Sequence, residues 1–288
     1  MKSCKKNMDK KRASKQSAYN KRQIRALRKA VYNHYRLHAR NLPWRRACTP
    51  YRIFISEIML QQTQVERVID KYKLFIRAFP SFASLSQADM KDVLSMWQGL
   101  GYNRRAMMLW KCAKLIRSKY RGKLPRDPAI LQTLPGIGPA TAASIAAYAY
   151  NTPAIFIETN IRTVFIHHFF AGKSNVADAK LIPLIEQALD IKNPSRWYNA
   201  LMDYGVMLKK KHANPSRKSA HYTRQSRFEG SDRQIRGKIL KLLLDGKSVT
   251  LKKLQDILNI NSRRCERNAK ALVNEGFLQK RRSYYYIV

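Results

Sequence analysis

Apolar residues recur at helical spacing along most of the chain before residue 210. From Pro50 to about Phe79 they fall close to every 3.6 residues, and a similar period runs through residues 24–35 and 176–209. Alternation of apolar and polar residues, which marks a half-buried strand, is almost absent before residue 275. We therefore predict a mainly α fold for this part of the chain.

A different pattern follows the polar and basic residues 209–232. Three helices and an alternating segment are predicted over Ile235–Leu244, Leu251–Leu258, Ser262–Glu275 and Phe277–Val288. Ser262 is the expected N-cap of the third helix. Three helices followed by a β-hairpin is the order of a winged helix, which places its third helix in the major groove of DNA. That helix carries the basic residues Arg263, Arg264, Arg267 and Lys270. They favour DNA over the alternative, a small helical domain that binds a protein partner.

Residues 134–142, LPGIGPATA, lie between two helical segments. Gly136 and Gly138 leave the backbone open to close approach, and Pro139 suits the first position of a helix. The N–H groups of the next helix's first turn, with the positive end of its dipole, would form a site for a phosphate. An ordinary turn between two helices is the alternative, and the rest of the chain has to decide between them.

Charge indicates the class of partner. The chain has 288 residues, with 57 Lys and Arg against 18 Asp and Glu, and a formal net charge of +39. This excess suits a polyanion, and nucleic acid is the expected one because no run approaches the roughly 18 apolar residues of a membrane-spanning helix. We expect a soluble, intracellular protein.

The chain has four cysteines, Cys4, Cys48, Cys112 and Cys265. They form no C-x-x-C pair, which argues against a zinc or iron–sulfur site and against a disulfide framework.

Two glutamates stand where a carboxylate could take part in chemistry. Glu57 lies in the segment SEIMLQQTQ, and on a helix Leu60, Gln61 and Gln64 would share its face. An apolar neighbour raises the pKa of a carboxyl group and suits it to act as a general acid. Glu158 follows the apolar run IFI, where a carboxylate is costly unless it is paired or used. The alternative for each is an ordinary solvated or helix-capping residue.

Five segments together resemble one family of enzymes. They are LPW at residues 42–44, SEIMLQQTQV at 56–65, WQGLGYNRRA at 97–106, LPGIG at 134–138 and IETNIR at 157–162. In this order they resemble the helix–hairpin–helix base-excision glycosylases (HhH-GPD), and among these the MutY-like adenine DNA glycosylases. The likeness runs in register from about Leu42 to Met207, and the Gln-Gln-Thr-Gln segment separates it from the endonuclease III branch.

The resemblance implies a two-lobed helix–hairpin–helix fold and a reaction in which a purine is flipped out of the duplex. Glu57 would protonate the base. Glu158, supported by Asn160, would stabilise the oxocarbenium ion of the sugar, as the paired carboxylates of glycosidases do. These three residues are the candidate catalytic set.

The resemblance also implies contacts with DNA. Gln62 and Tyr102 would wedge into the duplex opposite the extruded base, and Thr63 would lie near the partner base. Leu60 and Trp44 would line the base pocket, and the hairpin would contact the backbone through Gly136, Gly138 and Ala140. Backbone carbonyls of the hairpin hold a monovalent cation in relatives, and the same is expected here.

Two catalytic positions depart from the family pattern. Glu158 stands where the family normally has Asp, and one added methylene moves the charge by roughly 1.5 Å. A misplacement of about 1 Å can cost on the order of a hundredfold in rate, so efficiency and substrate are where this chain is expected to differ. Ala140 occupies the place of the lysine nucleophile of bifunctional members. Without that amine no Schiff base forms, and we expect a monofunctional enzyme without lyase activity.

The end of the chain departs as well. After Met207 the family continues with a Cys-rich iron–sulfur loop, whereas Lys209, Lys210 and Lys211 and their neighbours include no cysteine. We expect no cluster, and we expect these lysines to take over its contacts with the DNA backbone. The family's C-terminal domain, which checks for 8-oxoguanine opposite the adenine, is expected to be replaced by the winged-helix-like segment.

The predicted organisation is a basic disordered tail at residues 1–22, a glycosylase domain at 23–208, a basic linker at 209–232 and a winged-helix-like domain at 233–288. The predicted protein is a monomer without a metal centre or membrane association that removes adenine mispaired with guanine or 8-oxoguanine from double-stranded DNA. It would act in the cytoplasm with the nucleoid, or in the nucleus of a eukaryote.

Two alternatives stay open. One is a glycosylase for another mispaired or damaged base, such as thymine or uracil opposite guanine. The other is a non-catalytic DNA-binding protein.

Overall fold

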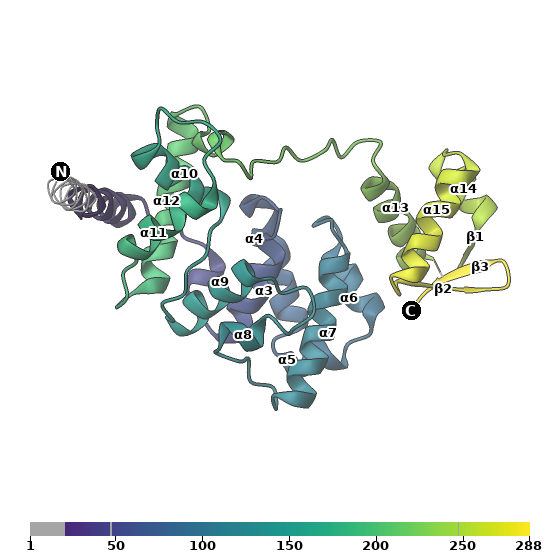
Figure 1. Ribbon diagram of the computed structural model, residues 1–288. Helices are drawn as coiled ribbons and strands as arrows, with labels where there is room; N and C mark the ends of the chain where they lie inside the picture. Colours follow the sequence, from purple (N-terminus) through teal and green to yellow (C-terminus); the bar gives the residue numbers. More distant parts are fainter. Residues whose placement is uncertain (1–20, 47, 247) are drawn as a thin grey trace, which may run out of the picture. The chain divides into compact units, whose positions relative to one another are not determined.

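The computed structural model describes residues 21–46, 48–246 and 248–288, and these are mainly helical, as predicted (Figure 1). They fall into two compact units, each built from two stretches of sequence. Unit 1 contains the chain up to Asn41 and Ala146–Thr223, and unit 2 contains Leu42–Ile145 and Arg224–Val288. The contiguous domains expected from the sequence stay a prediction. The predicted tail at residues 1–22 lies outside the described residues, except for Lys21 and Arg22, which are helical.

Unit 1 is a helical bundle around buried aromatic side chains. Its named elements are α10 (Thr159–Phe169), α11 (Asp178–Ala188), α12 (Pro194–Lys211) and the short 3₁₀ helix η1 (Pro215–Lys218). Residues 21–38 are also helical, and their predicted apolar face, Ile24, Leu27 and Val31, is buried. Phe165 of α10 and Trp197 of α12 are fully buried in the core of this unit.

Unit 2 holds the larger set of elements. Its first stretch contains α2 (Pro43–Arg46), α3 (Pro50–Leu60), α4 (Val65–Ala78), α5 (Phe82–Gln87), α6 (Met90–Trp97), α7 (Arg104–Lys119), α8 (Pro128–Leu131) and the start of α9 (Pro139–Tyr150). The core includes Phe75 of α4 and Trp97 of α6, whose rings meet edge to face with centroids 6.0 Å apart. None of the helices in the described ranges is long and apolar enough to span a membrane.

The helical pattern from Pro50 to about Phe79 corresponds to two helices. α3 ends at Leu60 and α4 begins at Val65, and between them Gln62 has a left-handed backbone with φ 52°. Gln61 and Gln64 therefore do not continue the helical face of Glu57, and this expectation was wrong. A cue was present in the sequence: the apolar positions Leu60 and Val65 are five residues apart, which breaks the helical period.

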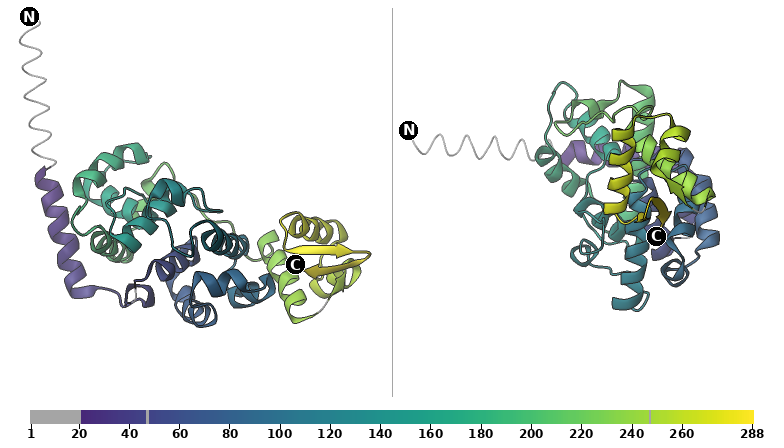
Figure 2. Two further views of the ribbon diagram at one scale, coloured as in Figure 1. Left: turned by 90° about the horizontal axis from the view of Figure 1, so that it is seen from below. Right: turned by 90° about the vertical axis from the view of Figure 1, so that its right-hand side faces the viewer.

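The second stretch of unit 2 contains three helices and a small sheet (Figure 2). The elements are α13 (Asp232–Asp245), β1 (Val249–Thr250), α14 (Leu251–Leu258), α15 (Ser262–Asn274), β2 (Leu278–Arg281) and β3 (Tyr284–Ile287). The strands pair antiparallel in the order β1-β3-β2. The predicted helices and hairpin are confirmed, β1 was too short to detect by alternation, and the winged-helix assignment stays a prediction.

Two element ends differ from expectation. The N-cap of α15 is Asn261, whose side chain accepts a hydrogen bond from the Arg264 backbone N–H at 2.8 Å, whereas Ser262 is the first helical residue. Both residue types cap helices well, so the sequence alone did not separate them. α12 continues to Lys211, three residues into the predicted linker. The last helical turn is therefore available to position side chains next to α10.

Candidate active site and nucleic-acid interface

The glycine hairpin has the predicted local structure. α8 is followed by the turn and then by α9, which begins at Pro139, and the Gly138 carbonyl accepts the Ala142 N–H at 2.9 Å. Gly136 has φ +75°, and a Cβ there would approach the Met108 side chain at 3.0 Å. A Cβ on Gly138 would meet none of the described atoms within 4 Å, and Ala140 is exposed. The backbone of the turn and the first turn of α9 are thus accessible.

Glu57 is held by the helix that follows this hairpin. The Ser144 hydroxyl, buried on α9, donates a hydrogen bond of 2.6 Å to Oε2 of Glu57. One turn earlier on α9, the Thr141 hydroxyl accepts a hydrogen bond of 3.2 Å from the Gln61 amide. The candidate general acid and the candidate phosphate-binding turn are therefore connected through α9. Ser144 was missed by sequence reasoning, because within an Ala-rich helix it looked like a small packing residue.

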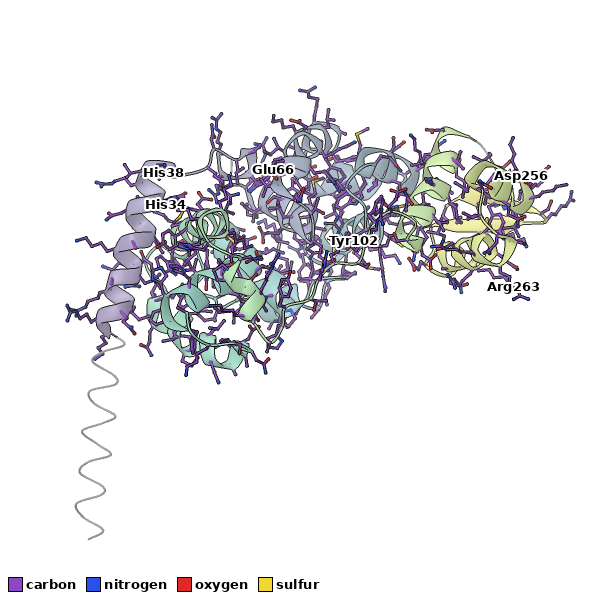
Figure 3. The ribbon with its side chains drawn as sticks, turned by 90° about the horizontal axis from the view of Figure 1, so that it is seen from above. His34, His38, Glu66, Tyr102, Asp256 and Arg263 are labelled. Carbon is purple, nitrogen blue, oxygen red and sulfur yellow. The ribbon has the colours of Figure 1, made fainter. Side chains whose placement is uncertain are left out.

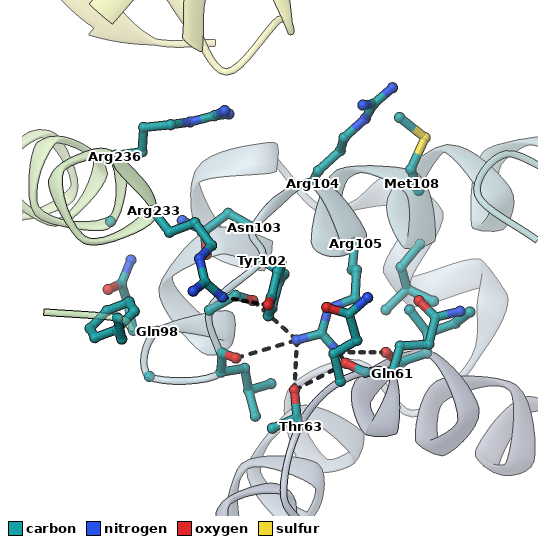
Figure 4. Close-up of a pocket in the computed structure, with 18 of the residues that line it drawn as sticks. Gln61, Thr63, Gln98, Tyr102, Asn103, Arg104, Arg105, Met108, Arg233 and Arg236 are labelled. Atoms are coloured by element: carbon teal, nitrogen blue, oxygen red, sulfur yellow. Dashed lines mark hydrogen bonds between the residues drawn. The ribbon is translucent and has the colours of Figure 1, made fainter. Parts of the chain in front are cut away.

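Arg105 organises the two loops that carry the predicted DNA-wedging residues. Its guanidinium donates to the carbonyls of Ile58, Met59 and Gln61 at the end of α3, at 2.9, 2.8 and 2.5 Å. The same group donates to the Thr63 hydroxyl at 2.9 Å and to the Gly101 carbonyl at 3.1 Å (Figure 4).

Burial lowers the pKa of Arg105 to about 10, so the side chain stays charged at neutral pH. Gln62 and Tyr102, on the two loops that Arg105 joins, both have left-handed backbones, with φ of 52° and 47°. Each is next to a residue that Arg105 holds, so the guanidinium fixes both strained turns. Arg105 was present in the quoted WQGLGYNRRA motif but was not singled out.

Glu158 lies at the N-cap of α10, where the positive end of the helix dipole favours a carboxylate. Its side chain makes no capping hydrogen bond with the described residues. Burial raises the pKa of Glu158, and the positive charges of Arg162 and Lys209 act in the opposite direction. Arg162 is itself bound by both carboxylate oxygens of Asp178, at 2.8 and 2.6 Å.

Asn160 is oriented by α12. The Lys209 ammonium donates to Oδ1 of Asn160 at 2.8 Å, and the Asn160 amide donates to the Met202 sulfur at 3.5 Å. Burial lowers the pKa of Lys209, while Glu158 raises it. The lysine was expected to contact the DNA backbone with Lys210 and Lys211, but it is half-buried and faces Asn160, whereas those two are exposed.

The remaining candidates are the two base-pocket residues and the arginines of α15, and the structure shows their burial and contacts. Leu60 is the last residue of α3 and is half-buried, and Trp44 is buried with its ring 5.4 Å from that of Tyr72. Arg264 and Arg267 each bind a carboxylate oxygen of Asp232 at 2.8 Å. The Asp232 carboxylate therefore partly neutralises both arginines. Their neighbour Arg263 is exposed (Figure 3).

The cysteines of the described segments do not fit an iron–sulfur cluster, which needs four thiolates around one site. Cys112 is buried on α7 and donates to the Pro135 carbonyl at 3.1 Å, and Cys265 is buried on α15. Within the described residues, no group of three or more His, Cys, Asp or Glu side chains is arranged to hold a metal ion.

Comparison with known proteins identifies the family. The model of the HhH-GPD superfamily base excision DNA repair proteins matches residues 55–182. The adenine DNA glycosylase of Mycolicibacterium smegmatis is 32% identical over 269 residues, which cover 86% of this chain and 90% of that protein. The chain belongs to the adenine DNA glycosylase family of the HhH-GPD superfamily. The matched segment includes Glu57, the hairpin and Glu158.

One further family member and one solved structure show how much of the chain the likeness covers. The adenine DNA glycosylase of Buchnera aphidicola subsp. Baizongia pistaciae is 37% identical over 178 residues, 62% of this chain and 50% of that relative. The chain thus spans about half the length of the Buchnera members of the family. The structure of a thermostable thymine-DNA glycosylase superposes with a TM-score of 0.58 at 23% identity over 65% of this chain and 87% of that one. This likeness places the helical units in the glycosylase fold.

Proposed function

We propose that the protein is a DNA N-glycosylase of base excision repair that removes adenine mispaired with guanine or 8-oxoguanine. The observation that carries the proposal is the hydrogen bond that fixes Glu57 to Ser144 on the helix of the phosphate-binding hairpin. Through this bond α9 would have two roles, because its first turn would contact the DNA backbone and its Ser144 positions the acid that acts on the base.

Glu57 is the general acid of the proposed reaction. A base must leave the stack before its glycosidic bond is accessible, and protonation of the base by the Glu57 carboxyl group makes it a better leaving group. When Glu57 has given up its proton, the Ser144 hydroxyl at 2.6 Å stabilises the carboxylate that remains. The hydrogen bond therefore favours the form of Glu57 that proton transfer produces.

Glu158 is the proposed electrostatic partner of the sugar. Its negative charge stabilises the oxocarbenium ion that develops as the bond to the base breaks. Lys209 holds Asn160 and, with Arg162, opposes the effect of burial on the Glu158 carboxyl group. The positive charges of Lys209 and Arg162 favour the carboxylate form of Glu158, against the effect of burial. Water completes the reaction at the sugar and leaves an abasic site.

Strand cleavage is not part of the proposed activity. Ala140 has no amine, so it cannot attack the sugar to form the Schiff base that β-elimination requires. The proposed product is an intact strand with an abasic site. We propose further that the enzyme is a monomer without an iron–sulfur cluster, that a monovalent cation binds at the hairpin carbonyls, and that it acts at the nucleoid or in a nucleus.

The proposal is tested by single-turnover excision on labelled duplexes that carry adenine opposite 8-oxoguanine, adenine opposite guanine, thymine opposite guanine, or adenine opposite thymine. We expect strand breaks only from mispaired adenine and only after hot alkali. Glu57→Gln should reduce excision by at least about a hundredfold with duplex affinity retained. Excision of thymine and not adenine would show that the enzyme removes a different base. Binding without excision of any base would make the protein a non-catalytic DNA binder.

A further inference from the structure

The loop between α6 and α7 leaves the direction of the Tyr102 side chain to contacts from elsewhere. Gly99, Gly101 and Tyr102 all have left-handed backbones, with φ of 90°, 69° and 47°. Two of these three residues are glycines, which makes the loop backbone permissive. Arg105 binds the loop at the carbonyls of Leu100 and Gly101, at 3.3 and 3.1 Å. These hydrogen bonds fix the backbone of the loop and leave the Tyr102 hydroxyl to other partners.

Two side chains from the second stretch of unit 2 bind that hydroxyl. Arg233, in the first turn of α13, and Gln225 both donate hydrogen bonds to it, from 131 and 123 residues later in the chain. Figure 4 shows Arg233 reaching toward the ring from α13. The Arg233 and Arg105 guanidinium carbons also lie 5.2 and 5.6 Å from the centre of the ring, where a cation is attracted to an aromatic system. Tyr102 is thus held both at its hydroxyl and at its ring.

Arg233 is itself fixed in place. Its guanidinium donates hydrogen bonds to the carbonyl and the hydroxyl of Ser226, at 2.7 and 3.0 Å. On the same helix, Ile235 and Ile239 are buried in the core. The Arg233 side chain therefore extends from a packed helix and joins Ser226 to Tyr102.

The sign of the charge separates positioning of Tyr102 from inhibition. A segment that covered Tyr102 against DNA would compete with a polyanion, and negative charge would suit that task. Arg233 is positive instead, and Lys238 and Lys241 follow it on α13 and line the cavity beside Tyr102. A phosphate backbone is attracted to such a surface. The contact between Arg233 and Tyr102 is therefore compatible with bound DNA.

We propose that Arg233 is a positioning residue for extrusion of the base, and that it acts by holding the Tyr102 ring in the direction in which it enters the duplex. The inference rests on the proposed function and on the wedge role that the family resemblance implies for Tyr102. A side chain that is ordered before DNA binds loses less freedom on binding, so extrusion becomes more favourable. The C-terminal part of the chain thereby acts, through Tyr102, on the step that precedes the chemistry.

Base extrusion and excision test the inference on the full chain in saturating excess over a duplex. The duplex carries, opposite guanine, either adenine or 2-aminopurine, an adenine analogue that brightens when it leaves the stack. Arg233→Met should reduce the extrusion equilibrium and the single-turnover rate about tenfold, because one aromatic side chain loses a cation and a hydrogen bond. The matched control is Lys252→Met, which removes the same charge from the exposed face of α14, away from the residues that line the cavity. It should change neither quantity.

A double-mutant cycle separates positioning from a general loss of structure. Tyr102→Phe removes only the hydroxyl that Arg233 binds, and it should reduce extrusion in the same direction. The double variant should lose less than the product of the two single effects, because both residues act through one contact. The inference is overturned if the two losses multiply, or if Arg233→Met behaves as Lys252→Met does. It is also overturned if Arg233→Met increases extrusion, since the contact would then be an inhibitory latch.

Failure of the proposed function gives a different result. A wild-type protein that excises adenine as fast as Arg233→Met refutes only the positioning role. A wild-type protein that excises no adenine refutes the proposed function, and the 2-aminopurine signal then still decides the role of Arg233.

Discussion

At the scale of single residues, Lys209 shows how a charge run can hide a buried contact. It belongs to a KKK sequence at the end of α12, which is typical of a solvated face, yet its ammonium binds Asn160 at 2.8 Å. Gly205 precedes it by four residues and faces the same Asn160. The i, i+4 spacing places Lys209 on the same face of α12 as Gly205, next to α10.

Lys209→Met should move the acidic limb of the pH–rate profile for excision to higher pH. In the proposed reaction Glu158 acts as a carboxylate, so the rate should fall as pH drops through its pKa, which burial already raises. Lys209 lowers that pKa by its positive charge, and its removal should raise the pKa further. Excision would then be lost first at low pH and retained at high pH. Single-turnover rates across the pH range measure this.

The matched control for this prediction is Lys210→Met, which removes the exposed neighbouring ammonium. It should leave the acidic limb at the wild-type pH. An unmoved limb in Lys209→Met, or an equal shift in both variants, would contradict the assignment of Lys209 as the positioning residue for Asn160 and Glu158.

At the scale of elements, the close approach of α10 and α12 determines where Glu158 and Asn160 lie. Gly205 of α12 packs against the first turn of α10, and an added Cβ would come within 2.7 Å of the Asn160 backbone oxygen. Backbone cannot yield as a flexible side chain does, so the two helices would have to separate. Because Gly205 has no Cβ, α12 can approach α10 closely, and this approach positions Glu158 and Asn160.

Gly205→Ala should destabilise the protein by about 1–3 kcal/mol, the usual cost of overpacking, and should reduce excision as Asn160 moves. The control is Gly237→Ala on α13, where an added Cβ meets no described atom within 4 Å. That substitution should stabilise the protein by about 0.4–1 kcal/mol, since Ala loses less chain entropy on folding. Thermal denaturation of both variants measures the pair, and equal melting temperatures would refute the packing argument.

At the scale of the whole molecule, the dominant property is positive charge. With a net charge of +39, many side chains can neutralise phosphates and release counterions from the duplex. This term acts on any DNA sequence, whereas contacts with base edges carry the sequence information. In the proposed function, charge therefore governs affinity for the duplex, and the geometry of the site governs which base is removed.

Duplex affinity should fall by at least about a thousandfold between about 50 and 200 mM salt, as expected for six or more phosphate contacts. Fluorescence anisotropy on an undamaged duplex measures the slope of log affinity against log salt concentration. Lys211→Met should reduce the slope by about one if this exposed lysine contacts a phosphate. A nearly flat salt dependence would contradict binding led by phosphates.

The sequence by itself determined the helical class, the hairpin and most of the C-terminal elements. Periodicity reports which face of a segment is buried, and the Gly-x-Gly-Pro turn and Asn or Ser caps act within a few residues of chain. The sequence also indicated the family, because the likeness runs in order from about Leu42 to Met207, over more than half of the chain. These are local or linear features, and a sequence displays them directly.

Tertiary structure alone decided the contacts between distant segments. Arg105 lies 45 residues after Leu60 and binds the carbonyls of Ile58 and Met59 at the end of α3. Ser144 meets Glu57 across 87 residues, and Lys209 meets Asn160 across 49. The sequence on either side of each of these residues is typical of a helix surface or a packed helix, so it does not predict the distant partner. Only the folded chain brings its polar group to the partner that gives it a role.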